Sequence, residues 1–338
     1  RNHLLMSKTA QRKDISDPEV IKEFAETVGD RNHLNYLYLL TIADIQGTDP
    51  ALWNNWKETL LDELYQKTLQ AMRRGLENPV NKDVLIADTK NNALALIKNT
   101  RKLKLDLNLL WQSLGEDYFL RHTPEEIAWH SGAIAQHTDS DDPLIMIEQR
   151  SQRGGTQIFV YMKNRDNIFA ATTRTLDRLG LNILDARIIT SENNYTLDSY
   201  IVLEKNGEPV NNKSRAEEII AALKRSLVNL DEFPRKLPAS RSRRHRQFTI
   251  KTRVHFTADE NNNRNIMEVV TTDRPGVLSR IGLALNFCGV SLQGAKIATY
   301  GARVEDIFFI TDRNNSMIDD PIKFECLENS IMTSLESN

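Results

Sequence analysis

An internal repeat in the second half of the chain is the feature that most constrains its fold. A shift of 109 residues places the segment NRDNIF at 164–169 on DRPGVL at 273–278. One residue drops out at the next hairpin, and Asp198 then aligns with Asp306. Each copy spans roughly 70 residues, enough for its own small core, so the repeat predicts two duplicated domains. Further pairs under the first shift are Gly180 with Gly289, Ala186 with Ala295, and Thr190 with Thr299.

Hydrophobic periodicity indicates the same order of elements in both copies. In the second copy, Leu278, Ile281 and Leu285 recur at helical spacing between two stretches that are typical of strands. A last helix is expected at about 320–335. In the first copy we expect strands at 156–163, 182–190 and 195–204, with helices at 168–180 and 214–230.

The turn Asp273–Gly276 joins the first strand of the second copy to its helix. Pro275 has no N–H to contribute, and Gly276 tolerates any backbone conformation. Such a turn leaves N–H groups free at a helix start, where a carboxylate binds favourably. Alone, this tetrapeptide is more typical of a tight turn, but its place in a repeat favours a binding site. The candidate ligand-binding residues are Asp273, Arg274, Pro275, Gly276, Val277 and Leu278.

The two copies resemble a tandem pair of ACT domains, the βαββαβ modules that bind amino acids in metabolic regulation. The resemblance implies an α+β chain in which a helical region precedes two ferredoxin-like domains, at 156–257 and 264–338. The first copy departs from the family turn, because Asn167 replaces the glycine and no proline precedes it. A weaker second site is therefore expected at Asn164, Arg165, Asp166, Asn167 and Ile168.

The segments that flank the first copy are expected to be linkers. Residues 138–155 turn polar around a short apolar run, and 235–246 are rich in Arg and Lys. The basic run lacks interleaved aromatic residues, so a solvated linker is favoured over contact with nucleic acid. The alternating segment 247–258 can supply the fourth strand of the first copy. The second copy would then keep an exposed sheet edge.

The first 137 residues have the pattern of helices. Asp17 before Pro18 is typical of a helix start, as is the capping box that begins at Thr123. The segment 34–45 is apolar nearly all round, which predicts burial in a larger helical core. Asp44 near its end either finds a cation or a donor, or caps the turn before Gly47 and stays solvated.

Residues 1–28 and 36–65 are similar to the closing helices of the HD-type hydrolase domain in the bifunctional PII uridylyltransferase and uridylyl-removing family. The resemblance implies that 1–75 end that domain and that 76–150 form a helical region and linker. Asp44 matches the last ligand of the family's Mg²⁺ or Mn²⁺ site. The other metal ligands and the nucleotidyltransferase signature have no counterpart here. The chain begins without methionine and is expected to be a fragment.

The family resemblance implies a function for the parent protein. It would transfer UMP from UTP to the nitrogen regulatory protein PII, and would hydrolyse it off when L-glutamine, the allosteric effector read by the ACT pair, is plentiful. The isolated chain is expected to be inactive. The alternatives are an ACT pair of an amino-acid biosynthetic enzyme or transcription regulator, and a stringent-response HD hydrolase with an ACT tail.

The composition of the chain argues against two classes of protein. A net charge of −2 and a pI near 6.4 argue against a nucleic-acid or membrane-surface protein, and no apolar run is long enough to span a bilayer. We therefore expect a cytoplasmic protein.

Cys288 and Cys326 are too few and too distant in sequence for a disulfide framework, and Cys288 is interpreted as a core thiol. Structural roles are expected for His122, His130, His137, Trp111, Tyr118, Phe119 and Trp129.

Overall fold

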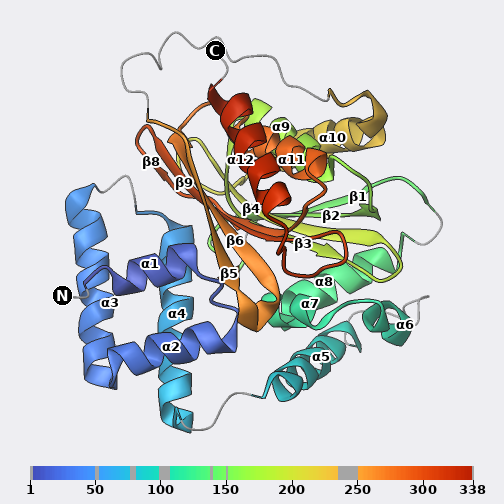
Figure 1. The fold of residues 1–338 in the computed structure, drawn as a ribbon. Helices are drawn as coiled ribbons and strands as arrows, with labels where there is room; N and C mark the ends of the chain where they lie inside the picture. Colours follow the sequence, from blue (N-terminus) through green and yellow to red (C-terminus); the bar gives the residue numbers. More distant parts are fainter. Residues whose placement is uncertain are drawn as a thin grey trace. The chain divides into compact units, whose positions relative to one another are not determined.

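The computed structural model describes residues 3–49, 53–76, 81–98, 107–137, 140–149, 151–234 and 250–336. It divides into two compact units (Figure 1). The helical unit comprises 1–140, 150–155 and 191–193, and the repeat unit comprises 141–149, 156–190 and 194–338. Helices come first and antiparallel strands follow, which confirms the predicted α+β class. In the described residues, no helix combines the length and apolarity needed to cross a membrane.

The helical unit is built from short amphipathic helices with well-defined starts. Asp17 accepts a hydrogen bond from the Glu19 N–H at 3.0 Å, and Pro18 occupies the first helical position. Thr123 and Glu126 form the predicted capping box, with reciprocal bonds of 3.3 and 2.8 Å. Its helices are α1 (Leu5–Arg12), α2 (Pro18–Val28), α3 (Arg31–Thr48), α4 (Asn55–Arg74), α5 (Lys82–Lys98), α6 (Leu107–Gln112), α7 (Glu116–Arg121) and α8 (Pro124–Ile134).

Helix α3 contradicts the prediction that its apolar surface is buried. Leu34 and Thr41 are its buried residues, whereas Tyr36, Leu39 and Leu40 are 72%, 63% and 50% exposed. The helix packs on α1 and α4 along one side. Its other side has no covering element among the described residues of this unit, which is why an all-round apolar pattern did not produce all-round burial.

The segment 150–155 is part of the helical unit and not a free linker. The guanidinium of Arg153 donates to Glu63 at 3.1 Å, to both oxygens of Glu126 at 3.0 Å, and to the Arg121 carbonyl at 3.1 Å. Gly154 has a φ of +72°, and a Cβ there would lie 2.3 Å from the Asn55 carbonyl oxygen. A charged anchor and an obligatory glycine therefore fix this segment on α4 and α8.

Aromatic and histidine side chains fill the packing between α6, α7 and α8, as expected. Trp111 donates to Ser131 at 2.9 Å, and its ring meets Phe119 edge-on. Tyr118 is fully buried and its hydroxyl lies 3.0 Å from Nδ1 of His130. His122 and His130 are buried with ring centres 5.2 Å apart. These histidines are core residues of the helical unit.

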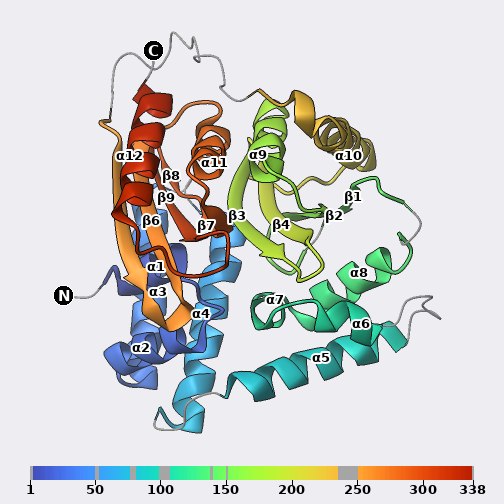
Figure 2. The same ribbon diagram turned by 45° about the vertical axis from the view of Figure 1, so that its right-hand side comes forward.

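The repeat unit is a sheet of nine strands in the described chain, with two helices from each copy (Figure 2). The sheet order is β1-β2-β4-β3-β7-β9-β6-β5, with β8 paired to β9. One apolar core joins the sheet to α9, α10, α11 and α12. The first copy holds β1 (Leu144–Glu148), β2 (Thr156–Lys163), α9 (Ile168–Arg178), β3 (Leu181–Thr190), β4 (Tyr195–Glu204), α10 (Lys213–Val228) and η2 (Leu230–Glu232). The second holds β5 (Arg253–Asp259), η4 (Glu260–Asn262), β6 (Arg264–Thr272), α11 (Val277–Phe287), β7 (Ser291–Lys296), β8 (Thr299–Tyr300), β9 (Arg303–Thr311) and α12 (Pro321–Glu336).

The two copies pair with each other at the centre of the sheet, where a local twofold axis relates them. Strands β3 and β7 pair antiparallel, with Ala186 opposite Ala295, Asp185 opposite Lys296 and Arg187 opposite Gly294. Ala186 and Ala295 are the residues that the 109-residue shift makes equivalent. The copies therefore join edge to edge in a self-complementary register, as two subunits of a symmetric dimer do.

The order of strands within each copy corrects two predictions. Strand β5 pairs antiparallel with β6, from Arg253 opposite Val270 to Asp259 opposite Arg264, so it closes the second copy and not the first. The edge of the first copy is closed by β1, in the stretch expected to be a linker. In each copy, a short connection joins the outer strand to the next strand in sequence, β1 to β2 and β5 to β6. The order of elements in each copy is therefore ββαββα and not βαββαβ. The basic run 235–246 lies outside the described residues.

Cys288 and Cys326 form a disulfide, with Cα atoms 5.9 Å apart, so the interpretation of Cys288 as a core thiol is wrong. Helix α12 packs along α11, which brings cysteines 38 residues apart in sequence next to each other. Sequence distance alone concealed this contact. The bond ties the last helix of the second copy to the end of α11.

Candidate functional site

The predicted binding turns have nearly the same backbone conformation in both copies. We call residues 164–168 turn 1 and residues 273–278 turn 2. Asn167 precedes α9 with φ 70° and ψ 5°, and Gly276 precedes α11 with φ 83° and ψ 12°. Asparagine is among the few side chains that adopt this left-handed region readily. The missing glycine therefore does not alter turn 1.

Close packing of α9 on α11 brings each turn against the helix of the other copy. Ser279 donates to the Ala170 carbonyl at 2.7 Å. A Cβ on Gly282 would lie 2.9 Å from the Phe169 ring and 3.2 Å from Cβ of Ala170, so a small residue is required there. The start of α9 is thus lined by residues of both copies.

A cavity of about 120 Å³ lies at turn 1. The turn itself forms one wall, and the polar groups of Thr190, Thr196 and Asp198 come from strands of the first copy. The second copy contributes the opposite wall, including Gly282, Asn286, Ser291 and Arg313. The site that sequence reasoning ranked second therefore has a defined cavity.

Asp198 on β4 is a buried acid of this cavity. It is 1% exposed, and burial raises its pKa to about 7. Hydrogen bonds from the hydroxyl groups of Thr196 and Tyr200 favour the carboxylate and limit the rise. A carboxyl group in this state can accept a cation in exchange for its proton.

Asp306 on β9 is the equivalent acid of the second copy. It is fully buried, and burial raises its pKa well above the ordinary value, with a further contribution from the charge of Asp273. One oxygen accepts from the Ala298 N–H at 3.2 Å, and the other has no hydrogen-bond partner among the described residues. The sequence analysis did not select these two acids as site residues. Their signal was a carboxylate at one position of an apolar strand in both copies.

Equivalent residues of α11 and α9 differ in charge. Asn286 donates from its amide to the side-chain oxygen of Asn167 at 2.8 Å. At the equivalent position of the repeat, α9 carries Asp177, whose pKa is raised by burial and lowered in part by the Gly276 N–H. Arg313 lines the turn 1 cavity and lies 3.9 Å from Asp166 at the exposed rim. Turn 1 therefore faces a neutral amide and a cation, whereas α9 carries an acid at the position of that amide.

The other predicted turn residues have structural or peripheral positions. Ile168 and Val277 are buried at the first helical positions, where they anchor α9 and α11 in the core. Arg165 also lines the turn 1 cavity, and its guanidinium pairs with Asp231 at 2.6 Å. Arg274 is partly buried, and burial lowers its pKa.

Comparison with known proteins shows that the chain is similar to part of the bifunctional uridylyltransferase/uridylyl-removing enzymes. Residues 81–133 match the family described as the uridylyltransferase GlnD fifth domain. The chain is 46% identical over 341 residues to the bifunctional uridylyltransferase/uridylyl-removing enzyme of Pseudomonas syringae pv. syringae, covering 100% of this chain and 38% of that protein. The enzyme of Stutzerimonas stutzeri is 46% identical over 340 residues, covering 99% of this chain and 38% of its own length. No solved structure matches.

The chain matches the C-terminal part of bifunctional uridylyltransferase/uridylyl-removing enzymes. It spans 38% of the length of these relatives. The fifth-domain match covers α5 to α8 of the helical unit.

Asp44, the metal ligand implied by the family, is exposed on α3. The helix continues past Gly47 to Thr48, whose hydroxyl donates to the Asp44 carbonyl at 2.7 Å, so Asp44 does not cap a turn there. The described residues contain no group of three or more His, Cys, Asp or Glu side chains that could hold a metal ion. These residues alone therefore do not fit a bound Mg²⁺ or Mn²⁺, and Asp44 can supply at most one ligand.

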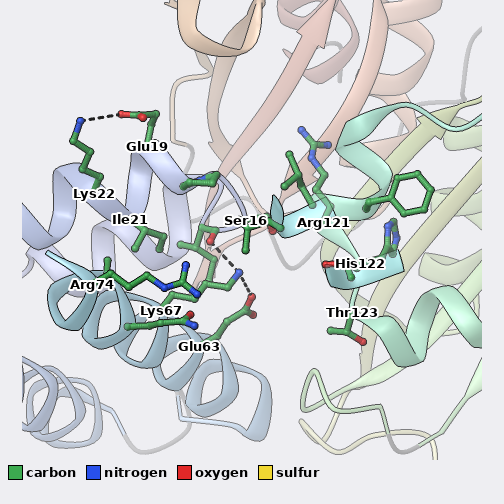
Figure 3. A pocket seen from close by; sticks show the side chains of 18 of the residues that line it. Ser16, Glu19, Ile21, Lys22, Glu63, Lys67, Arg74, Arg121, His122 and Thr123 are labelled. Carbon is green, nitrogen blue, oxygen red and sulfur yellow. Dashed lines mark hydrogen bonds and ion pairs between the residues drawn. The ribbon is translucent and has the colours of Figure 1, made fainter. Parts of the chain in front are cut away.

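A second cavity, of about 270 Å³, lies within the helical unit between α2, α4 and the fifth-domain helices (Figure 3). Its cations are largely neutralised by acids. Lys67 lies 2.7 Å from Glu63 and also donates to the Ile15 carbonyl, and Lys22 lies 3.8 Å from Glu19, as Figure 3 shows. This pairing gives the cavity little preference for an anion.

Proposed function

We propose that this chain is the glutamine-sensing regulatory part of an enzyme that uridylylates PII and removes UMP from it. The match to the bifunctional enzymes supports the enzyme class. The single observation that carries the sensing role is the cavity at turn 1, which combines a helix start, a cation and a buried acid. These are the groups that an amino acid's two charged ends require.

The α-carboxylate of glutamine would lie at the start of α9. Backbone N–H groups and the positive end of the helix dipole favour an anion there, and Arg313 adds a cation from the second copy. The arrangement uses both copies, because α9 and Arg313 belong to different halves of the repeat.

The α-ammonium of the ligand would pair with Asp198. A cation beside this carboxyl favours its ionised form and lowers its pKa from about 7. Binding near neutral pH would therefore release a proton. Calorimetry in buffers of different ionisation enthalpy measures this release directly, and its absence would remove Asp198 from the site.

The amide of glutamine distinguishes it from glutamate. The hydroxyl groups of Thr190 and Ser291 and the amide of Asn286 line the cavity, and such neutral groups can both donate to and accept from an amide. A carboxylate only accepts hydrogen bonds, so it would leave the acceptors that face the amide N–H groups unpaired, and it would lie near Asp198.

We further propose the roles of the full-length protein from its relatives' names. It would take UMP from UTP, with PII as acceptor, and Mg²⁺ or Mn²⁺ would serve hydrolysis at a site to which Asp44 contributes one ligand. We propose a cytoplasmic location, where PII and free glutamine are available to such an enzyme.

Titration calorimetry of the 338-residue chain with L-glutamine and L-glutamate tests the sensing role. We expect saturable binding of glutamine and at least about tenfold weaker binding of glutamate, because unpaired buried acceptors cost about 1–3 kcal/mol. Equal affinities, or no binding of glutamine, would contradict the proposal.

A further inference from the structure

The disulfide between Cys288 and Cys326 lies at one wall of the turn 1 cavity. Asn286 precedes Cys288 by two residues and Val290 follows it by two, and both line the cavity. Cys326 belongs to α12, which lies beside α11 in Figure 2. The bond therefore attaches α12 to the segment that forms the second copy's wall of the cavity.

Hydrogen bonds hold the backbone on both sides of Cys288 in a closed turn. The N–H of Gly289 donates to the Asn286 carbonyl at 3.1 Å, and the N–H of Val290 donates to the Leu285 carbonyl at 2.9 Å. Gly289 has a φ of +66°. This is the pattern in which a glycine ends a helix. Because Cys288 lies inside the turn, a movement of Cys288 also moves the cavity-lining residues on either side of it.

The first copy holds the equivalent junction without a covalent bond. Helices α10 and α12 coincide under the 108-residue shift, which places Glu218 on Cys326, and the 109-residue shift places Leu179 on Cys288. The guanidinium of Arg215 donates to the Leu179 carbonyl and pairs with Glu218 at 2.7 Å. The same two helices are thus joined by an ionic contact in one copy and by a covalent bond in the other. The covalent junction is the one that belongs to the cavity wall.

The disulfide is open to exchange with thiols. Cys288 and Cys326 are both half-buried, so an external thiol can reach the bond. In the cytoplasm, thiols keep most cysteines reduced, and the disulfides that form there are usually transient and sense or catalyse redox change. A thiolate attacks one sulfur and breaks the S–S bond, and a second thiolate attacks the resulting mixed disulfide. Two thiols thereby become one disulfide, while the two cysteines gain two electrons and two protons.

Reduction leaves other contacts that hold α12 in place. Leu327, Ile331 and Leu335 are fully buried in the common core of the repeat unit. Arg280 in α11 also donates to the Ser334 carbonyl at 3.1 Å. None of these contacts needs the bond between the cysteines. The constraint that reduction removes is therefore local to the end of α11 and the cavity wall.

Resting on the proposed function, we propose that the Cys288–Cys326 bond is a redox control of the ligand site. The disulfide holds the second copy's wall of the turn 1 cavity in the binding arrangement, and reduction to two thiols weakens glutamine binding. A wall that is already ordered loses less conformational freedom when a ligand binds. The chain thus responds to glutamine and to the thiol redox state at one site.

Titration calorimetry with L-glutamine on the 338-residue chain tests this control. The chain is oxidised with oxidised glutathione or reduced with dithiothreitol, and its free thiols are counted before each titration. Glutamine should bind at least about threefold more weakly to the reduced chain, which is the effect of ordering roughly one side chain. Reoxidation should restore the affinity. Reduction should also lower the midpoint of thermal unfolding by roughly 5–15 °C.

Two substitutions on α12 separate the bond from its surroundings. Cys326→Ser cannot form the disulfide, so it should bind glutamine with the affinity of reduced wild type whether or not dithiothreitol is present. Ser330→Ala is the matched control, because Ser330 lies one helical turn from Cys326 and its hydroxyl is 3.6 Å from the Cys288 sulfur. This variant keeps both cysteines and should retain the full response to reduction.

The outcomes distinguish this inference from the proposed function. Equal glutamine affinity in the oxidised and reduced chains, or a Cys326→Ser variant that binds as tightly as oxidised wild type, would overturn the redox control and leave glutamine sensing intact. Two free thiols after treatment with oxidised glutathione would overturn it as well, and so would a reduced chain that no longer folds. Glutamine binding by neither form of wild type would overturn the proposed function itself.

Discussion

The two copies of the repeat share a fold but not a surface at their turns. Turn 1 carries asparagine and no proline, yet it adopts the conformation of the Asp-Arg-Pro-Gly turn and borders a cavity. Turn 2 has the better family sequence, but the residue of α9 that is equivalent to Asn286 is the acid Asp177, whose pKa burial raises. The comparison teaches that the competence of a turn depends on what the neighbouring copy places against it, as well as on the turn's own residues.

The largest expected effect comes from replacing Gly282 in α11 with threonine, the residue that α9 has at the equivalent position of the repeat. Gly282→Thr places a branched group 2.9 Å or less from the Phe169 ring, so it should fill the turn 1 cavity and strain the α9–α11 contact. Overpacking of this kind costs about 1–3 kcal/mol. We expect glutamine affinity to fall more than about tenfold and the urea midpoint to drop.

Gly132→Ala is the matched control, because a Cβ on this helical glycine meets nothing within 4 Å. It should raise stability by about 0.5–1 kcal/mol and leave ligand binding unchanged. Unaltered glutamine affinity in Gly282→Thr would contradict the assignment of the cavity as the site.

The next effect concerns the buried acid of the first copy. The folded-state pKa of Asp198, about 7, lies above its ordinary value of 3.8. Folding therefore takes up a proton between these pH values, and the stability that this group contributes below pH 3.8 is lost as pH rises through about 7. Asp198→Asn should raise the unfolding free energy at pH 8 by on the order of 1–3 kcal/mol and change it little at pH 4.

Urea unfolding at both pH values measures the difference. A variant that loses more stability at pH 8 than at pH 4 would mean that the carboxylate is stabilised in the fold, which would contradict the raised pKa. The same variant should also bind glutamine without releasing a proton, which separates the stability effect from the ligand effect.

A smaller effect on ligand affinity is expected when the cations that follow β9 and β4, at equivalent positions of the repeat, are replaced. Arg313→Gln should weaken glutamine binding by about threefold to tenfold, since an exposed charge contributes less than about 1.4 kcal/mol. Lys205→Gln, its counterpart under the 108-residue shift, should change wild-type affinity by less than about twofold. Equal losses in the two variants would indicate that both turns bind ligand.

The smallest effect should follow from Asn167→Gly, which gives turn 1 the N-cap residue of turn 2. Both residues tolerate the left-handed conformation, so we expect a stability change within about 0.5 kcal/mol. The lost bond to Asn286 is partly exposed and worth little. A large loss of stability in thermal unfolding would show that Asn167 fixes the turn through its side chain.

Local patterns in the sequence predicted the elements well. The capping residues Asp17 and Thr123 act as expected, and the repeat register places Ala186 opposite Ala295 in the sheet. These features depend on neighbours in sequence or on direct comparison of two segments, and both kinds of information are present in the chain.

Features that depend on distant partners could not be predicted in the same way. The alternating pattern of β5 indicates a strand but does not specify whether β2 or β6 completes it. The apolar pattern of α3 likewise says nothing about which neighbours cover it. The bond between Cys288 and Cys326 and the contact of Asn286 with Asn167 follow from helix packing, which brings together residues that no local spacing relates.

The self-complementary register at Ala186 and Ala295 suggests how such a sensor arises by duplication. A single ancestral copy would join a second, identical copy through the same edge, and its two ligand sites would be bound to change together. Fusion of the copies into one chain removes that constraint. Each half then mutates independently, so equivalent positions can diverge on one side alone, as Gly282 and Thr173 or Asn286 and Asp177 do.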